Sequence, residues 1–202
     1  MDVGTLLESF GYFIIFLSVF IESGVILGLV LPLPGFSLLF AAGVFATTDK
    51  LSLLGVIVTG SLAAILGYVV GYYTGLKYGR KLLYEKKTER YFTAKQGKAA
   101  EKFMKKYGYS TLVIGRWLPV LHSVAPLLSG IARTPFTPFM ITNIVGGILW
   151  VLSSTLLGYY IGQVVPNAQY YIIPFVAALV IIVNTSYGKR LANRITKKVE
   201  EM

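Results

Sequence analysis

The chain has 202 residues, of which 55% are hydrophobic and only 14% charged, and its mean hydropathy is +0.67. This composition excludes an ordinary water-soluble domain and indicates an integral membrane protein. Cysteine is absent, which excludes disulfides, thiolate metal sites and thiol nucleophiles, and the net charge of +10 is concentrated in two basic stretches, 77–106 and 189–198.

The first apolar segment, Phe10 to Leu31, contains one ionisable residue, Glu22, and ends at Pro32-Leu33-Pro34-Gly35. A carboxylate at membrane depth costs at least about 2.5 kcal/mol, and non-helical backbone there must be surrounded by protein or water. The following segment, Phe36 to Thr47, is too short to cross, because twelve helical residues cover only about 18 Å of a core about 30 Å thick. We therefore predict a re-entrant hairpin that is broken at the two prolines and the glycine between these segments.

The third apolar segment, Leu51 to Tyr78, is long enough to cross the membrane, which takes roughly 20 helical residues. It carries glycines at four-residue spacing, which place one glycine face along a helix and let another helix approach closely. These glycines are Gly67, Gly71, Gly75 and Gly79. We interpret them as helix-packing residues.

The basic connector, 80–106, is predicted to be cytoplasmic together with the C-terminus, because Lys and Arg accumulate on that side of membrane proteins. Its pattern is compatible with an amphipathic helix on the inner leaflet or with a solvated linker. Candidate lipid contacts are Tyr91, Phe92, Phe103 and Met104. Because the basic runs adjoin spans and lack interleaved aromatic stacking positions, we expect anionic lipid headgroups as partners and no nucleic acid.

Beyond the connector, the segment from Tyr109 to Ile131 is interrupted at Pro119 and Pro126, and we predict a second re-entrant hairpin broken at these prolines. The apolar stretch from Phe136 to Tyr187 is split near Pro166-Asn167 and is long enough for two spans.

The two halves of the chain, 1–79 and 107–165, resemble each other. Gly71-Tyr72-Tyr73-Thr74-Gly75 recurs as Gly158-Tyr159-Tyr160-Ile161-Gly162, although shared membrane-helix composition could also produce this. The first glycine-rich span ends at the cytoplasmic connector, and the second must end outside for the last span and basic tail, 166–202, to return inside. The predicted fold is thus one all-α polytopic membrane domain with inverted repeats, each a re-entrant hairpin and a transmembrane helix, plus a C-terminal transmembrane helix.

Two arginines flank the second predicted hairpin break. Arg116 lies within the apolar segment and Arg133 follows its end, so a fold-back would bring both near one cavity. A guanidinium stays charged at any accessible pH and matches phosphate oxygens with two parallel hydrogen bonds. We expect Arg116 to bind a lipid phosphate with help from Arg133, although Arg133 could instead extend to the membrane interface.

Two further ionisable residues lie in the apolar segments. His122, the only histidine, is compatible with a neutral side chain bonded to a carbonyl or with a proton-exchanging group that assists phosphate binding. Glu22 is the better proton carrier, or it is a fixed ion-pair partner for Arg116 that holds the two hairpins together. These alternatives stay open from the sequence.

Other kinds of site are not indicated. The sequence has no nucleotide-binding loop, metal-ligand cluster or catalytic triad, so we expect no cofactor, no metal and no enzymatic activity. Self-association into a homo-oligomer stays open.

Short motifs in a characteristic order cover nearly the whole chain. They are Phe20-Ile21-Glu22-Ser23, Pro32-Leu33-Pro34-Gly35, the glycines from Gly67-Tyr68 to Gly75, Tyr107-Gly108, Gly115-Arg116-Trp117-Leu118-Pro119, Ala125-Pro126 with Ser129-Gly130, and Phe139 through Asn143, Gly146 and Trp150. In this order and spacing the chain resembles the DedA family, whose membrane region is called the VTT or SNARE-associated domain.

The resemblance implies facing re-entrant hairpins and movement of lipids across the bilayer. For bacterial members it implies recycling of undecaprenyl phosphate or translocation of phosphatidylethanolamine, often linked to the proton gradient, and for eukaryotic relatives scrambling. By position, Glu22 matches the family's hairpin glutamate and Arg116 its Gly-Arg arginine. Phe36 stands where many members have an acid, and His122 where many have a second arginine.

The sequence therefore predicts a lipid flippase or scramblase of the cell membrane that moves a phosphate-bearing lipid. A proton-coupled carrier of small ions or osmolytes is one alternative, and a membrane scaffold that recruits partners through the basic connector is another. The side of the membrane on which the N-terminus lies stays open.

Overall fold

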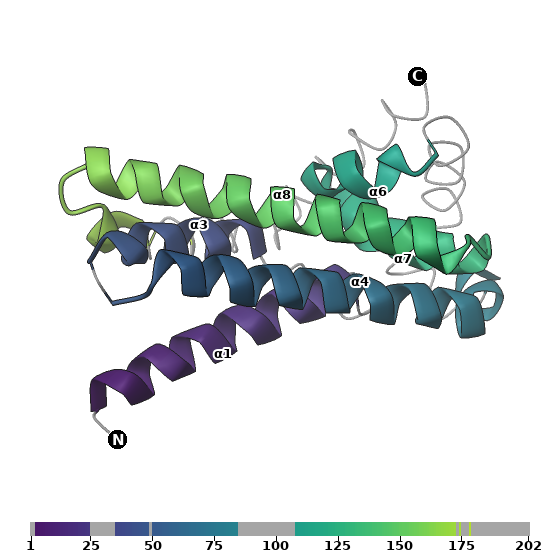
Figure 1. The fold of residues 1–202 in the computed structure, drawn as a ribbon, viewed down its shortest axis with the longest axis horizontal. Helices are drawn as coiled ribbons and strands as arrows, with labels where there is room; N and C mark the ends of the chain where they lie inside the picture. Colours follow the sequence, from purple (N-terminus) through teal and green to yellow (C-terminus); the bar gives the residue numbers. More distant parts are fainter. Residues whose placement is uncertain are drawn as a thin grey trace.

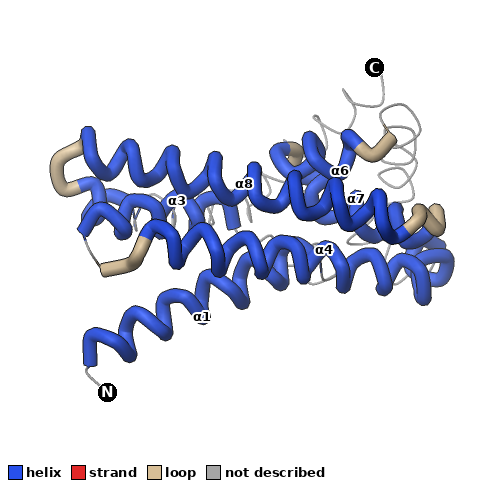
Figure 2. The backbone as a smooth tube through the Cα atoms, in the orientation of Figure 1, coloured by secondary structure: helices blue, strands red, loops and turns tan. Residues whose placement is uncertain are grey.

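The computed structural model describes residues 3–24, 35–48, 50–84 and 108–172, together with Pro174 and Ala178. Every element in this part of the chain is helical (Figure 2), which confirms the predicted all-α class. The α-helices are α1 (Val3–Gly24), α3 (Gly35–Phe45), α4 (Leu53–Tyr84), α6 (Ser110–Ile114), α7 (Pro119–Ile131) and α8 (Phe136–Val164), with 3₁₀ turns η1 (Ala46–Thr48) and η2 (Gly115–Trp117).

Two long helices, α4 and α8, pack side by side and run in opposite directions along the whole molecule (Figure 1). Within the described residues, Leu53–Tyr78 and Phe136–Val164 are the helical stretches long and apolar enough to cross a membrane. An outer row of apolar side chains on α4 is exposed at four-residue spacing, namely Leu54, Val58, Leu62, Leu66 and Val70. A continuous apolar face of this kind suits contact with lipid better than contact with water.

The shorter helices cover different halves of the long pair. In Figure 1, α1 and α3 lie along one half, and α6 and α7 lie along the other. The packing is reciprocal, since α1 and α7 contact α4, whereas α3 and α6 contact α8. Each long helix therefore packs mainly against one shorter helix from each half of the sequence.

The predicted break at Pro119 is present. Leu118 is extended, with φ −107° and ψ 112°, between η2 and α7, and Pro119 opens α7 at its first turn. Proline suits that position because its missing N–H has no partner in a first helical turn. The chain thus changes direction immediately before Pro119.

Pro126 does not break the chain, contrary to our prediction. It lies inside α7, which continues without interruption to Ile131. A proline costs the helix one hydrogen bond, and its ring lies against Gly71 of α4, where a side-chain carbon built on the glycine would be only 3.1 Å away. The tight packing between α7 and α4 supports a helix that proline alone would weaken.

The glycine face of α4 lies at close helix contacts. A side-chain carbon on Gly67 would lie 2.7 Å from the Phe20 carbonyl oxygen of α1, and one on Gly75 would overlap the Leu127 carbonyl of α7. Only glycine permits this backbone approach. Gly79 belongs to α4 as well, but its surroundings lie outside the described side chains.

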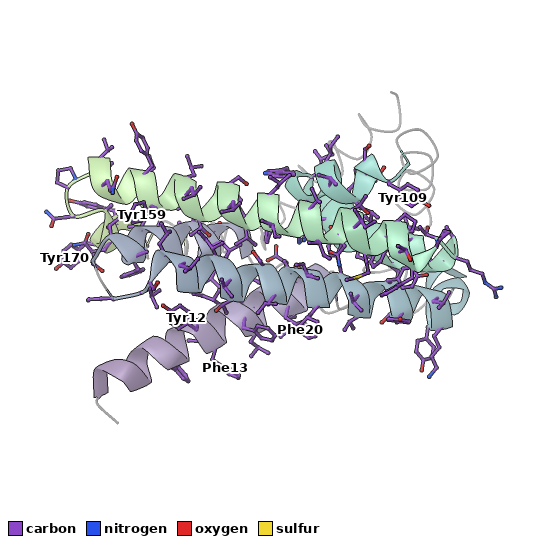
Figure 3. The ribbon with its side chains drawn as sticks, in the orientation of Figure 1. Tyr12, Phe13, Phe20, Tyr109, Tyr159 and Tyr170 are labelled. Atoms are coloured by element: carbon purple, nitrogen blue, oxygen red, sulfur yellow. The ribbon has the colours of Figure 1, made fainter. Side chains whose placement is uncertain are left out.

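Helix α1 reaches the start of α4 through a tyrosine. The Tyr12 hydroxyl accepts a 2.8 Å hydrogen bond from the Ser52 backbone N–H, and Figure 3 shows Tyr12 directed toward α4 and Phe13 directed away from it. This contact satisfies one backbone donor next to the first turn of α4.

Several predictions concern residues outside the described part of the chain. These are Pro32 and Pro34 at the first break, most of the basic connector with Tyr91, Phe92, Phe103 and Met104, and most of the C-terminal span and tail. Helix α4 itself continues to Tyr84, past the end of the predicted span.

A hydrogen bond joins α4 to the turn between α7 and α8. The Tyr72 hydroxyl donates to the Thr134 carbonyl at 2.7 Å. Tyr72→Phe is expected to lower the thermal unfolding midpoint in detergent slightly, because such a bond contributes about 0.6 kcal/mol in membrane proteins. Tyr73→Phe is the control, since the Tyr73 ring is 52% exposed. Equal midpoints for the two variants would contradict this role.

Candidate functional site

Arg116 is buried at the centre of the helix bundle. It belongs to η2, directly before the break at Leu118, and its side chain is only 2% exposed. The guanidinium carbon lies 3.6 Å from the centre of the Tyr68 ring of α4, a cation–π contact. Side-chain carbons built on Gly146 and Gly147 of α8 would lie 3.3 Å from Nε and 3.6 Å from Nη2. The glycines therefore provide the space in which the guanidinium lies.

A neutral side chain, that of Asn143, forms a hydrogen bond with one edge of the Arg116 guanidinium. Arg116 Nη2 donates to Asn143 Oδ1 at 2.6 Å, and Asn143 Nδ2 donates to the Ile65 carbonyl of α4 at 3.0 Å. Asn143 is fully buried. The amide thus joins η2, α4 and α8 in one chain of hydrogen bonds.

The remaining guanidinium donors are not satisfied. Within the part of the chain that the structure describes, Arg116 Nε and Nη1 have no hydrogen-bond partner, and no acid forms an ion pair with the side chain. Buried polar groups normally have partners, and a buried unpaired charge is costly. This arrangement suits an anion that accepts hydrogen bonds from these two nitrogens.

His122 lies beside Arg116 between two aromatic rings. Its ring centre is 4.9 Å from that of Trp150 and 5.8 Å from that of Tyr68. The side chain is only 4% exposed; neither ring nitrogen forms a hydrogen bond of full geometry with the described residues, but the Arg116 backbone interacts with the ring. Its expected role in phosphate binding stays a proposal that this position supports.

Glu22 meets the start of α3 rather than Arg116. It lies near the end of α1, its Oε2 atom is buried, and the Gly35 N–H interacts with its carboxylate. A side-chain carbon on Gly35 would overlap the carboxylate, so glycine leaves the carboxylate free to occupy this position. The positive end of a helix dipole favours an acid at this place. This contact joins the end of α1 to the start of α3.

The expected ion pair between Glu22 and Arg116 is absent from these described residues. Tyr68 lies within electrostatic range of both groups, and its buried hydroxyl has no hydrogen-bond partner in the same part of the chain. The two charges thus belong to one buried region without direct contact.

Arg133 does not join this cluster, contrary to our expectation. It is exposed, with φ 51°, in the turn after α7. Arg116 precedes α7 and Arg133 follows it, so a helix about 20 Å long separates the two arginines. The extended residue Leu118 lies before α7, so it does not shorten the distance along this helix.

The sequence pattern assigns no role to Tyr68, Asn143 or Trp150, which are found only as parts of motifs. Asn143 carried a usable signal, because it is the only side-chain amide between Thr134 and Gly162. Tyr68 carried none, since tyrosines are frequent throughout this chain.

Comparison with known proteins identifies the family. A family model described as the VTT domain matches residues 33–160. Protein DedA of Escherichia coli K12 is 34% identical over 156 residues, which are 76% of this chain and 69% of that protein. The chain belongs to the DedA family. Uncharacterized membrane proteins ML0287 of Mycobacterium leprae and Rv0364 of Mycobacterium tuberculosis are further relatives of the chain.

ML0287 is 30% identical over 184 residues, which are 89% of this chain and 81% of that protein. Rv0364 is 32% identical over 152 residues, which are 74% of this chain and 65% of that protein. No solved structure matches the chain. The family and the names of these relatives agree with a membrane location. Of the residues in the buried region, the VTT match includes Arg116, His122 and Asn143 but begins after Glu22.

Proposed function

We propose that this DedA-family protein moves a phosphate-bearing lipid across the cell membrane, as a flippase or scramblase. The observation that carries the proposal is the buried Arg116, whose guanidinium donates to one neutral amide and has two nitrogens without a partner among the described residues. A guanidinium with free donors in an apolar interior binds phosphate oxygens through charge-assisted hydrogen bonds. Undecaprenyl phosphate and phospholipids both present such oxygens.

The path is formed by two inverted re-entrant hairpins that face each other at the centre of the bundle. The same sequence spacing separates Pro32 from Pro119 and Gly43 from Gly130. Gly43 of α3 faces the Thr155 carbonyl of α8, and Gly130 of α7 faces the Tyr72 carbonyl of α4. A glycine of a shorter helix thus meets a backbone carbonyl of a long helix in both halves of the bundle. Antiparallel long helices and reciprocal packing further support inversion.

Broken helices of this kind admit a headgroup at membrane depth, because non-helical backbone survives there only against protein or a cavity. The phosphate contacts Arg116 and His122, while the acyl or prenyl chain stays among the exposed apolar side chains of α4 and α8. Exposed Arg133 provides an outer contact for anionic headgroups. The basic connector and the C-terminus lie on the cytoplasmic side.

The test is translocation by the purified protein in proteoliposomes, with labelled lipids that differ only in headgroup. Phosphate-bearing lipids are expected to move, with and without a pH gradient compared in parallel, and a neutral diacylglycerol analogue is expected to show no protein-dependent movement. Flux of small ions without lipid movement would instead favour a solute carrier.

Glu22→Gln is expected to slow translocation and to remove its dependence on a pH gradient, because glutamine keeps the shape of the side chain but cannot carry a proton. The measurement is the initial rate of lipid movement with the inside acidic, neutral or alkaline. Glu8→Gln, at the other acid of α1, is the control. A full gradient response in Glu22→Gln would remove Glu22 from proton coupling.

A further inference from the structure

We infer that Asn143 is the positioning residue that keeps Arg116 available to an anionic phosphate group. This inference rests on the proposed function for its ligand class. It adds which residue orients the Arg116 guanidinium and why the site prefers a negatively charged ligand.

The guanidinium is fixed from three directions. The Tyr68 ring lies against its face, and the glycine pair Gly146 and Gly147 leaves room beside α8. Among the described residues, only Asn143 forms a hydrogen bond with it, at Nη2. The Tyr68 ring and the two glycines form no hydrogen bond with the guanidinium among the described residues. The Asn143 amide is therefore the group that determines how the guanidinium is rotated in its own plane.

Asn143 is itself fixed. Its Nδ2 donates to the Ile65 carbonyl at 3.0 Å, so its Oδ1 must be the atom that faces Arg116. The side chain is fully buried, and it lies in α8, whereas Ile65 and Tyr68 lie one turn apart on α4. The two long helices therefore orient the guanidinium together.

The choice of an amide over an acid has an electrostatic consequence. A carboxylate at position 143 would form a buried ion pair with Arg116 and cancel the charge that attracts an anion. A neutral acceptor orients the guanidinium and leaves its charge uncompensated, while Nε and Nη1 remain without partners in the described structure. The ligand that fits is a phosphate monoester or diester, from a lipid headgroup or from free phosphate.

Asn143→Asp is the direct test, because it keeps the Oδ1 acceptor and adds a charge. Trp117→Phe leaves Trp150 as the only tryptophan of the chain, one turn beyond Gly147 and next to His122. In this background, quenching or enhancement of Trp150 fluorescence reports binding of short-chain phosphatidic acid to the protein in detergent. Short-chain diacylglycerol and inorganic phosphate are the parallel probes.

Asn143→Asp is expected to weaken phosphatidic acid binding about thirtyfold, as loss of a buried charge interaction does. Asn143→Leu, which keeps the site's charge but loses its orientation, is expected to weaken binding less. Asn167→Asp is the matched control, because exposed Asn167 lies in the turn after α8. In an Arg116→Gln background, Asn143→Asp should cause no further loss, which a merely structural role would not predict.

Unchanged binding in Asn143→Asp would overturn the inference, as would an equal loss with and without Arg116. If the Asn143→Asp variant does not fold, Asn143→Leu becomes the deciding variant. Full affinity of Asn143→Leu for phosphatidic acid would overturn the inference that Asn143 positions Arg116. A response to inorganic phosphate alone supports the role of Asn143 and identifies free phosphate as the source. Because binding is measured without transport, wild-type protein that binds the lipid but does not move it would refute only the proposed function.

Discussion

Arg116→Gln is expected to reduce the rate of phosphate-lipid translocation in proteoliposomes about thirtyfold or more. A hydrogen bond to a charged group contributes about 2 kcal/mol, and each 1.4 kcal/mol is about tenfold in an equilibrium constant. The buried guanidinium has two unpartnered nitrogens in the described structure, so its neutral replacement should leave the thermal unfolding midpoint unchanged or raise it. Lower activity with equal or higher stability is typical of a residue kept for function.

Arg133→Gln is the matched control for this variant, since it removes the same charge from an exposed turn. It should retain most of the translocation rate, with at most a modest change at low salt, because exposed charges are screened. Normal translocation by Arg116→Gln would exclude the buried site. Equal losses in both variants would indicate a general effect of positive charge.

Gly75→Ala is expected to lower the thermal unfolding midpoint in detergent by about 3–10 °C. The new methyl group would overlap the Leu127 carbonyl, so α4 and α7 must separate, and overpacking of this kind costs about 1–3 kcal/mol. The same displacement would move α7, which follows directly from the Arg116 segment. Translocation should therefore fall together with stability.

Gly11→Ala serves as the control, because both glycines lie inside helices, where alanine is favoured by about 1 kcal/mol. The added carbon at position 11 would lie 3.3 Å from Leu51 Cδ2, the end of a flexible side chain. Its midpoint should stay the same or rise slightly. A Gly75→Ala protein as stable as Gly11→Ala would show that α4 and α7 do not depend on close backbone contact.

Several features could be derived from the sequence because they depend on single residues or on short runs. Hydropathy and charge indicated a helical membrane protein, and the long charge-free runs predicted the two long helices. The break at Pro119 follows from local backbone chemistry, since proline restricts the residue before it. The cost of burying charge singled out Glu22 and Arg116 as functional candidates.

The partners of these residues depend on which helices pack together, and no short run of sequence specifies that. Asn143 reaches Arg116, and Glu22 reaches Gly35, because α8 and α3 bring residues distant from them into contact. Pro126 was expected to break a helix that packing against α4 preserves. The free-energy cost of burying a charge, or of placing a proline inside a helix, can be recognised from the sequence. The neighbouring residue that offsets this cost is determined only by how the helices pack.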